Sequence, residues 1–158
     1  MNGNGAGKRF ERKFREAMEP HGFVLRIPNS VQPRGGRLIG SETEADFLVA
    51  TGEDSYLVEC KASNRPRLDF YNVKEHQEES LAEFDAMGPR CHGFLAVEFY
   101  DSDGYRAPHR MFLLPVGEWL AFKEESGRKS MPVAEFEAKA VEVPYERGAY
   151  RFDGRWYA

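Results

Sequence analysis

Apolar and polar positions predict a helix, a strand and a hairpin in the first third of the chain. Within residues 8–18, apolar side chains recur every three or four positions, which predicts a helix that Pro20 ends. The run "FVLRI" at 23–27 predicts a strand. The runs "ADFLVA" at 45–50 and "SYLVECKAS" at 55–63 flank the turn sequence "TGED", so they predict a β-hairpin.

The same pattern continues through the rest of the chain. Residues 72–87 predict a second helix, and "HGFLAVEFYD" at 92–101 predicts a strongly apolar strand. "RMFLLPV" at 110–116 predicts another strand, "GEWLAFKEE" at 117–125 a short helix, and the tail from 127 to 158 a mixture of short elements. This order predicts an α/β fold, with one domain over residues 1–158 and a mixed central β-sheet flanked by helices.

One segment carries no clear helix or strand pattern. Residues 28–44, "PNSVQPRGGRLIGSETE", are rich in proline, glycine and basic side chains. Such a composition predicts a loop that is mobile in the free protein.

Composition and charge restrict the function classes only weakly. No apolar run approaches the ~20 residues of a membrane span, and the polar, glycine-rich N-terminus lacks the pattern of a signal peptide. The two cysteines are too few for a disulfide framework and lack CxxC spacing, so we expect a cytoplasmic protein without membrane association. The formal net charge is −4, yet residues 1–40 carry +5 and the remainder −9, which is typical of one basic face and an acidic back.

The predicted hairpin brings two carboxylates together. If Gly52 and Glu53 form the turn, facing residues sum to 105, and Asp46 lies opposite Glu59. Two acids that close favour either a shared proton or a bound cation. Strand alternation places Lys61 on the same face as Glu59.

An oxygen-rich site of this kind would suit a hard divalent cation. The ligands would be Asp46, Glu59 and the backbone carbonyl of Cys60 together with water, a set that Mg²⁺ prefers and that Mn²⁺ also accepts. The alternative is a plain cross-strand ion pair of Lys61 with Asp46 or Glu59 on a solvated sheet face.

These residues match a known nuclease pattern. Asp46, a hairpin and then Glu59-x-Lys61 resembles the PD-(D/E)xK nuclease motif, with Ala45 in place of its proline. The chain further resembles the RecU-type Holliday-junction resolvases through "GKRFERKF", which holds Glu11, through "YNVKEHQEESLAEFDAMG" before "GFLAVEFYD", and through "GRKSMPVAEFE". Together these stretches cover most of the chain.

The resemblance implies a restriction-endonuclease-like fold and a homodimeric, Mg²⁺-dependent endonuclease that cuts four-way DNA junctions, with a recombination helicase as a candidate partner. By motif position, Asp46 and Glu59 would bind the metal and Lys61 would be the catalytic lysine. Glu11 would complete the site, including as a further metal ligand. The alternative for Glu11 is a surface ion pair with Arg15 at helical spacing.

Two departures from the RecU-type pattern concern DNA contacts. The net acidity argues against tight non-specific DNA binding. Residues 28–44 look shorter than the stalk of RecU-type enzymes and resemble the compact archaeal Hjc-type resolvases, in which a loop serine assists catalysis. Ser30 and Ser41 are both candidates for that serine, and Gln77 is a candidate to touch the site or the DNA. Residues 28–44 are then an expected junction-contacting element.

Basic residues supply candidate phosphate contacts. They are Lys8, Arg9, Arg34, Arg37, Arg65, Arg67 and Lys74. The aromatic-rich stretches 94–99 and 112–122 are expected to form the core and a two-fold dimer interface. Two other functions remain open: a restriction or repair endonuclease of the same superfamily, and a catalytically silent DNA-binding accessory module.

Overall fold

The first helix buries the apolar stripe that the sequence predicts. α1 spans Gly3–Met18, and its Phe10, Phe14 and Met18 side chains are completely buried against the sheet. The 3-10 turn Glu19–His21 follows and contains Pro20, which cannot continue the backbone hydrogen bonds of a helix. The structure is a computed structural model that describes residues 3–28, 31–34, 37–40, 45–100 and 109–158.

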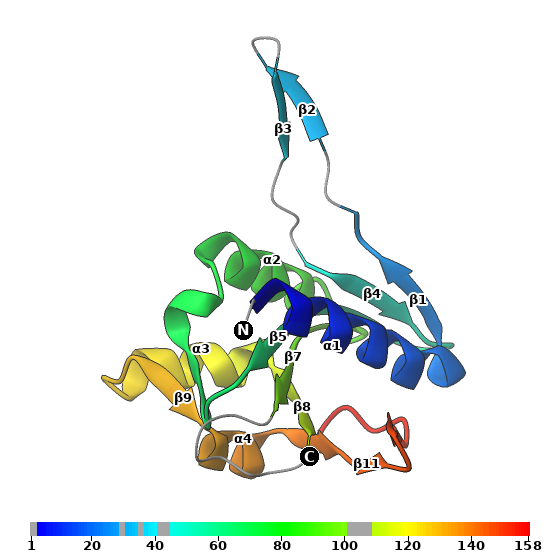
Figure 1. Ribbon diagram of the computed structural model, residues 1–158, viewed down its shortest axis with the longest axis vertical. Helices are drawn as coiled ribbons and strands as arrows, with labels where there is room; N and C mark the ends of the chain where they lie inside the picture. The colour runs from blue at the N-terminus through cyan, green and yellow to red at the C-terminus, as the bar shows by residue number, and fades with distance from the viewer. Residues whose placement is uncertain (1–2, 29–30, 35–36, 41–44, 101–108) are drawn as a thin grey trace.

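A mixed six-stranded sheet forms the centre of the molecule, in the order β1-β4-β5-β7-β8-β10 (Figure 1). Neighbouring strands are antiparallel except β5 and β7, which run parallel. The strands are β1 (Phe23–Arg26), β4 (Phe47–Ala50), β5 (Ser55–Ser63), β7 (Cys91–Phe99), β8 (Arg110–Pro115) and β10 (Val141–Val143). The α/β class and the mixed sheet predicted from the sequence are therefore confirmed.

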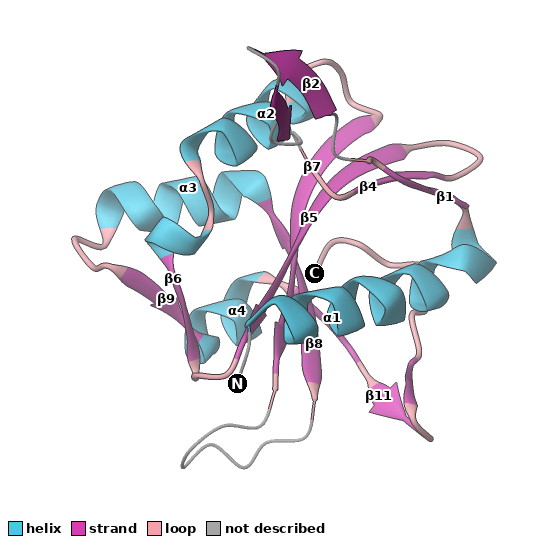
Figure 2. Cartoon of the chain, turned by 45° about the horizontal axis from the view of Figure 1, so that its top comes forward, coloured by secondary structure: helices cyan, strands magenta, loops and turns pink. Residues whose placement is uncertain are grey.

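Helices cover both faces of this sheet (Figure 2). α1 packs on one face, where Val58 and Cys60 of β5 point into its apolar cluster. The opposite face carries α2 (Glu75–Asp85), α3 (Val116–Glu125) and α4 (Val133–Lys139), whose cluster includes Leu57 of β5. Successive β5 residues alternate between these two clusters, so Glu59 and Lys61 share the face that α1 does not cover.

Among the described residues, three two-stranded sheets lie outside the central one. They are β2 (Val31–Arg34) with β3 (Arg37–Gly40), β6 (Arg67–Asp69) with β9 (Ser130–Pro132), and β11 (Tyr145–Glu146) with β12 (Ala149–Tyr150). A 3-10 turn at Phe70–Asn72 separates β6 from α2.

The prediction of a loop at 28–44 is wrong for residues 31–34 and 37–40, which form strands. β2 and β3 pair antiparallel in a hairpin that stands away from the central sheet (Figure 1). Pro33 lies within β2 and Gly40 within β3, and Gly35 and Gly36 lie between the two strands, so these Pro and Gly residues obscured the strand pattern.

The stretches 94–99 and 112–122, expected to form the core and a dimer interface, place their largest aromatic side chains in the core. Phe94, Phe99, Phe112 and Trp119 have no exposed surface in the monomer. The core part of the prediction is therefore confirmed, and the dimer interface stays a prediction. Within the described residues, no helix is long and apolar enough to cross a membrane.

A buried glutamate joins α2 to α3. The Trp119 indole donates a hydrogen bond of 2.7 Å to Glu78 Oε2, and Lys123 Nζ lies 2.9 Å from Glu78 Oε1. Glu78 is only 6% exposed, so these two partners replace the water that its carboxylate loses on burial.

We expect Glu78→Ala to lower the free energy of unfolding by about 1–3 kcal/mol, because it leaves the buried Trp119 N–H without an acceptor. Chemical denaturation measures this loss, with the exposed neighbour Glu79→Ala as the matched control. Equal stability of the two variants would contradict this role of Glu78.

Candidate active site

A cavity of about 520 Å³ opens where the predicted motif residues meet. It is lined from α1, from β1, from the β4–β5 hairpin and from the segment leading to α2. The lining residues are Gly7, Lys8, Glu11, Arg26, Asp46, Glu59, Cys60, Lys61, Ala62, Leu68 and Asn72. The cavity thus gathers all four residues for which the sequence predicted the main catalytic roles.

The hairpin has the predicted register up to its last pair. Phe47 faces Val58 and Ala50 faces Ser55, as the turn arithmetic requires. At Asp46 the regular ladder ends, because the backbone N–H of Asp46 donates to the Val58 carbonyl at 3.0 Å. The Asp46 carboxylate then replaces a backbone acceptor: its Oδ2 receives the Cys60 N–H at 2.8 Å. This bond fixes the Asp46 side chain beside β5.

Glu59 is a buried acid with an unsatisfied oxygen. Glu59 is only 3% exposed, and its Oε2 has no hydrogen-bond partner within the described part of the chain. Burial, and then the charge of Asp46, raise the pKa of Glu59 to about 9. The carboxyl group is therefore protonated at neutral pH unless a cation lies beside it.

Lys61 partly offsets this charge. Its Nζ lies 3.5 Å from Glu59 Oε1, and the side chain keeps 20% of its surface exposed towards the cavity. The alternative of a plain ion pair on a solvated face does not fit, because Glu59 is not solvated. Lys61 lowers the pKa of Glu59, but burial and Asp46 outweigh it.

Glu11 enters from α1 and does not form the predicted surface pair. Arg15 instead pairs with Glu19 at 3.1 Å, while Glu11 Oε1 lies 3.4 Å from Arg26 Nη2. Burial, and then the charge of Asp46, raise the pKa of Glu11, and Arg26 lowers it. Glu11 is therefore close enough to Asp46 to feel its charge.

The donor set fits a hard divalent cation. Oxygen atoms of Asp46 and Glu59 line one cavity, and the orphaned Glu59 Oε2 would gain a partner from such an ion. In the described part of the chain, no three His, Cys, Asp or Glu side chains are grouped to hold a metal by themselves. Two carboxylates, backbone oxygen and water would then complete the coordination, and Glu11 as a third acidic ligand stays a prediction.

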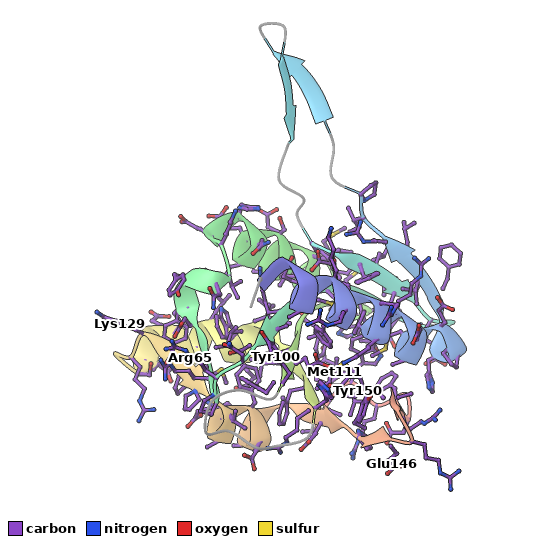
Figure 3. The ribbon with its side chains drawn as sticks, viewed as in Figure 1. Arg65, Tyr100, Met111, Lys129, Glu146 and Tyr150 are labelled. Carbon is purple, nitrogen blue, oxygen red and sulfur yellow. The ribbon has the colours of Figure 1, made fainter. Side chains whose placement is uncertain are left out.

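The other predicted residues have different positions. Lys8 lines the cavity, whereas Gln77 lies in the first turn of α2, where its Oε1 accepts the Lys74 N–H at 3.0 Å. Arg67 pairs with Asp69 at 3.5 Å, and Arg65 is exposed at the turn after β5 (Figure 3).

For several predicted contact residues, the structure gives only the backbone, only the exposure or no position. Ser30 and Ser41 lie outside the described residues. Arg34 and Arg37 face each other in the β2–β3 hairpin, but only their backbone is described. Arg9 and Lys74 are exposed residues near the start of α1 and α2. The DNA-binding role of the whole basic set remains a prediction.

Two polar side chains of the cavity were not predicted from the sequence. Arg26 reaches it because β1 pairs with β4 and places Arg26 opposite Phe47, next to Asp46. Asn72 reaches it from the 3-10 turn. Arg26 could have been identified only by predicting that β1 pairs with β4. No short-range signal in the sequence specifies that pairing.

The stability of the metal-free protein is expected to fall as the pH rises from about 4.5 to about 9. Below this range Glu59 is protonated in both states. Within it the unfolded chain releases the proton and the folded chain keeps it, so unfolding becomes more favourable with pH. Denaturation in EDTA at several pH values measures the effect. In Glu59→Gln this contribution should disappear, and parallel pH profiles of the two proteins would contradict the raised pKa.

The chain is similar to a known protein family and to a solved structure. A family model described as recombination protein U matches residues 39–150, which include Asp46, Glu59 and Lys61. The solved structure of Hjc, a Holliday junction resolvase from the archaeal hyperthermophile Archaeoglobus fulgidus, is similar with a TM-score of 0.57 and 20% sequence identity. The match covers 86% of this chain and 95% of that one, and it shows a shared fold. No curated protein matches the chain.

Proposed function

Because the chain belongs to the family of recombination protein U, we propose that it acts in recombination as a metal-dependent endonuclease that resolves four-way DNA junctions. The observation that carries the proposal is the cavity in which Asp46, Glu59 and Lys61 meet, where one buried carboxylate oxygen has no partner among the described residues. The fold shared with the archaeal Hjc resolvase supports the same function.

The cofactor that we propose is Mg²⁺, for which Mn²⁺ can substitute. Asp46 and Glu59 would hold it, with the Cys60 carbonyl and water as further oxygen donors. When bound, such an ion makes water more acidic and offsets the charge that builds on the scissile phosphate. Its binding would also displace the proton that burial keeps on Glu59.

The side chains around the cavity would have separate roles in catalysis and DNA binding. Lys61 is partly exposed in the cavity, so its ammonium group is placed to bind a phosphate oxygen and to orient the attacking water. Lys8 and Arg26 add positive charge to the wall supplied by α1 and β1, where they would hold the DNA backbone. Glu11 keeps Arg26 in place and adds negative charge next to Asp46.

Contacts farther from the cavity would select branched DNA. The β2–β3 hairpin leaves the sheet between β1 and Asp46, so it rises from the same end of the sheet as the cavity (Figure 1). Its paired Arg34 and Arg37 backbones lie beside its turn and would bring two basic side chains to the junction. The other proposed phosphate contacts are Arg9, Arg65, Arg67 and Lys74.

We propose a homodimer as the active form, since resolving a junction requires two symmetric cuts. A recombination helicase is a candidate partner, and the cytoplasm is the proposed location. Phe94, Phe99, Phe112 and Trp119 are buried in the monomer, so such an interface would use other side chains.

The test compares a labelled, immobile four-way junction with a linear duplex of the same sequence, in Mg²⁺, Mn²⁺ or EDTA. We expect symmetric, metal-dependent nicking of the junction, lost in Asp46→Asn, which keeps an oxygen to accept the Cys60 N–H. Equal cleavage of the duplex would indicate a general nuclease of the superfamily. Binding without cleavage in either metal would indicate an accessory module and contradict the enzymatic function.

A further inference from the structure

Tyr71 is the most exposed large apolar side chain among the described residues. Its side chain is 80% exposed, whereas Tyr56 and Tyr150 are 7% and 4% exposed. Within the described part of the chain, its ring packs on no other aromatic ring and its hydroxyl forms no hydrogen bond. Isolated exposed apolar residues are common on protein surfaces, so exposure alone assigns no role. The position of Tyr71 carries the argument.

Tyr71 belongs to a short segment that forms part of the rim of the candidate active site. It is the central residue of the 3-10 turn Phe70–Asn72, and the next residue, Asn72, lines the cavity together with Asp46, Glu59 and Lys61. Leu68, three residues before Tyr71, lines the same cavity. One short segment therefore borders the site and presents an aromatic ring to solvent.

The turn that carries Tyr71 is firmly anchored. Phe70 is buried with its ring at 5.2 Å from that of Trp119, and its N–H donates to the Lys129 carbonyl at 3.0 Å. Val73 is 2% exposed, and its N–H donates to the Phe70 carbonyl at 3.1 Å. Phe70 and Val73 therefore fix the turn on both sides, while the Tyr71 ring between them is 80% exposed, so a ligand would not have to order the backbone.

The chemistry of the rim matches a nucleobase beside a phosphate. Lys8 and Arg26 provide positive charge within the cavity, where the scissile phosphate would lie, and a base attached to the neighbouring sugar would extend beyond the rim. Every base has an apolar face that stacks on an aromatic ring. In a continuous duplex that face is covered by the adjacent base pairs, whereas bases at a branch point are more easily unstacked.

We propose that Tyr71 stacks on an unpaired nucleobase next to the scissile phosphate and so favours branched over linear DNA. This inference rests on the proposed function. Contacts to phosphates do not depend on whether a base is accessible, so they cannot distinguish a junction from a duplex in this way. An aromatic ring that stacks on an accessible base can. Tyr71 is then a specificity-determining residue, outside the group of residues that act on the phosphate.

The test measures binding in EDTA to a four-way junction and to a matched duplex. Loss of one base–aromatic stack in Tyr71→Ala should weaken junction binding by about 5- to 100-fold. Duplex binding should change by less than about twofold, as is usual for surface substitutions. Tyr71→Phe and Tyr71→Trp keep an aromatic face and should retain the preference. Phe23→Ala is the matched control, since Phe23 is an exposed aromatic residue (71%) that does not line the cavity.

A fluorescent base reports the contact directly. We would place 2-aminopurine next to the phosphate that the wild-type enzyme cuts and expect quenching on binding, retained in Tyr71→Phe and lost in Tyr71→Ala. Unchanged junction affinity and quenching in Tyr71→Ala, with normal wild-type cleavage, would overturn this inference alone. An equal loss of junction and duplex affinity would overturn the specificity role. A wild-type protein that neither binds nor cuts the junction would contradict the proposed function and this inference together.

Discussion

Replacing Glu59 with glutamine is expected to abolish junction cleavage while leaving junction binding intact. The amide has nearly the same size, but it cannot supply the negative charge that a divalent cation requires at the position of the orphaned Oε2. Changes in groups that only support metal ligands typically cost 10–100-fold, so loss of a ligand should reduce the cleavage rate by at least about 100-fold. Single-turnover cleavage in Mg²⁺ and a binding assay in EDTA separate the two effects.

Another buried glutamate, outside the cavity, provides the control for Glu59→Gln. Glu98 on β7 is also 3% exposed, but it receives hydrogen bonds from Tyr150 and Lys13 and does not line the cavity. Glu98→Gln should therefore cut the junction at close to the wild-type rate. Cleavage by Glu59→Gln at the same rate as Glu98→Gln would exclude Glu59 as a metal ligand.

Replacing Lys61 with methionine is expected to reduce the cleavage rate by about 10²–10³-fold, the usual cost of removing one preorganised charge or donor from a transition state. Methionine preserves much of the length and apolar volume of the side chain, so the cavity should keep its shape. Because Lys61 lowers the pKa of Glu59, the variant should also need a higher pH to ionise Glu59 and to load the metal. Cleavage rates measured across pH and Mg²⁺ concentration test both effects.

The matched control again lies outside the cavity. Lys123 pairs with the buried Glu78 at 2.9 Å, much as Lys61 pairs with Glu59 at 3.5 Å. Lys123→Met removes a comparable ion pair and should affect stability but not cleavage. If both lysine variants lost cleavage to the same extent, the effect would be one of folding and the catalytic role of Lys61 would fail. Lys61→Arg should not restore the rate, since a planar guanidinium does not replace a compact ammonium group.

The site combines two electrostatic demands that oppose each other. A buried, ionised Glu59 next to Asp46 is unfavourable, as its raised pKa shows, yet both carboxylates must be ionised to bind a cation. The protein therefore gives up stability in the metal-free state at neutral pH. Glu59→Gln should then stabilise the metal-free protein while it inactivates the enzyme, which is the opposite of what a purely structural residue would show.

The sequence by itself determined the motif and the local geometry around it. Strand alternation and a turn of fixed length set the register of the hairpin, because both depend only on neighbours along the chain. They place Glu59 and Lys61 on one face and bring Asp46 beside them. The apolar stripe of α1 is local in the same sense, and it predicted the burial of Phe10 and Phe14.

Only the tertiary structure decided which other groups join the site and how they behave. Glu11 and Arg26 meet because α1 docks on the sheet and β1 pairs with β4, contacts between segments that the periodicity of neither segment specifies. The turn with Tyr71 and Asn72 reaches the cavity because Phe70 and Val73 pack under α3 and the sheet. The raised pKa of Glu59 follows from desolvation, which depends on every element that excludes water from it and therefore exists only once the fold is complete.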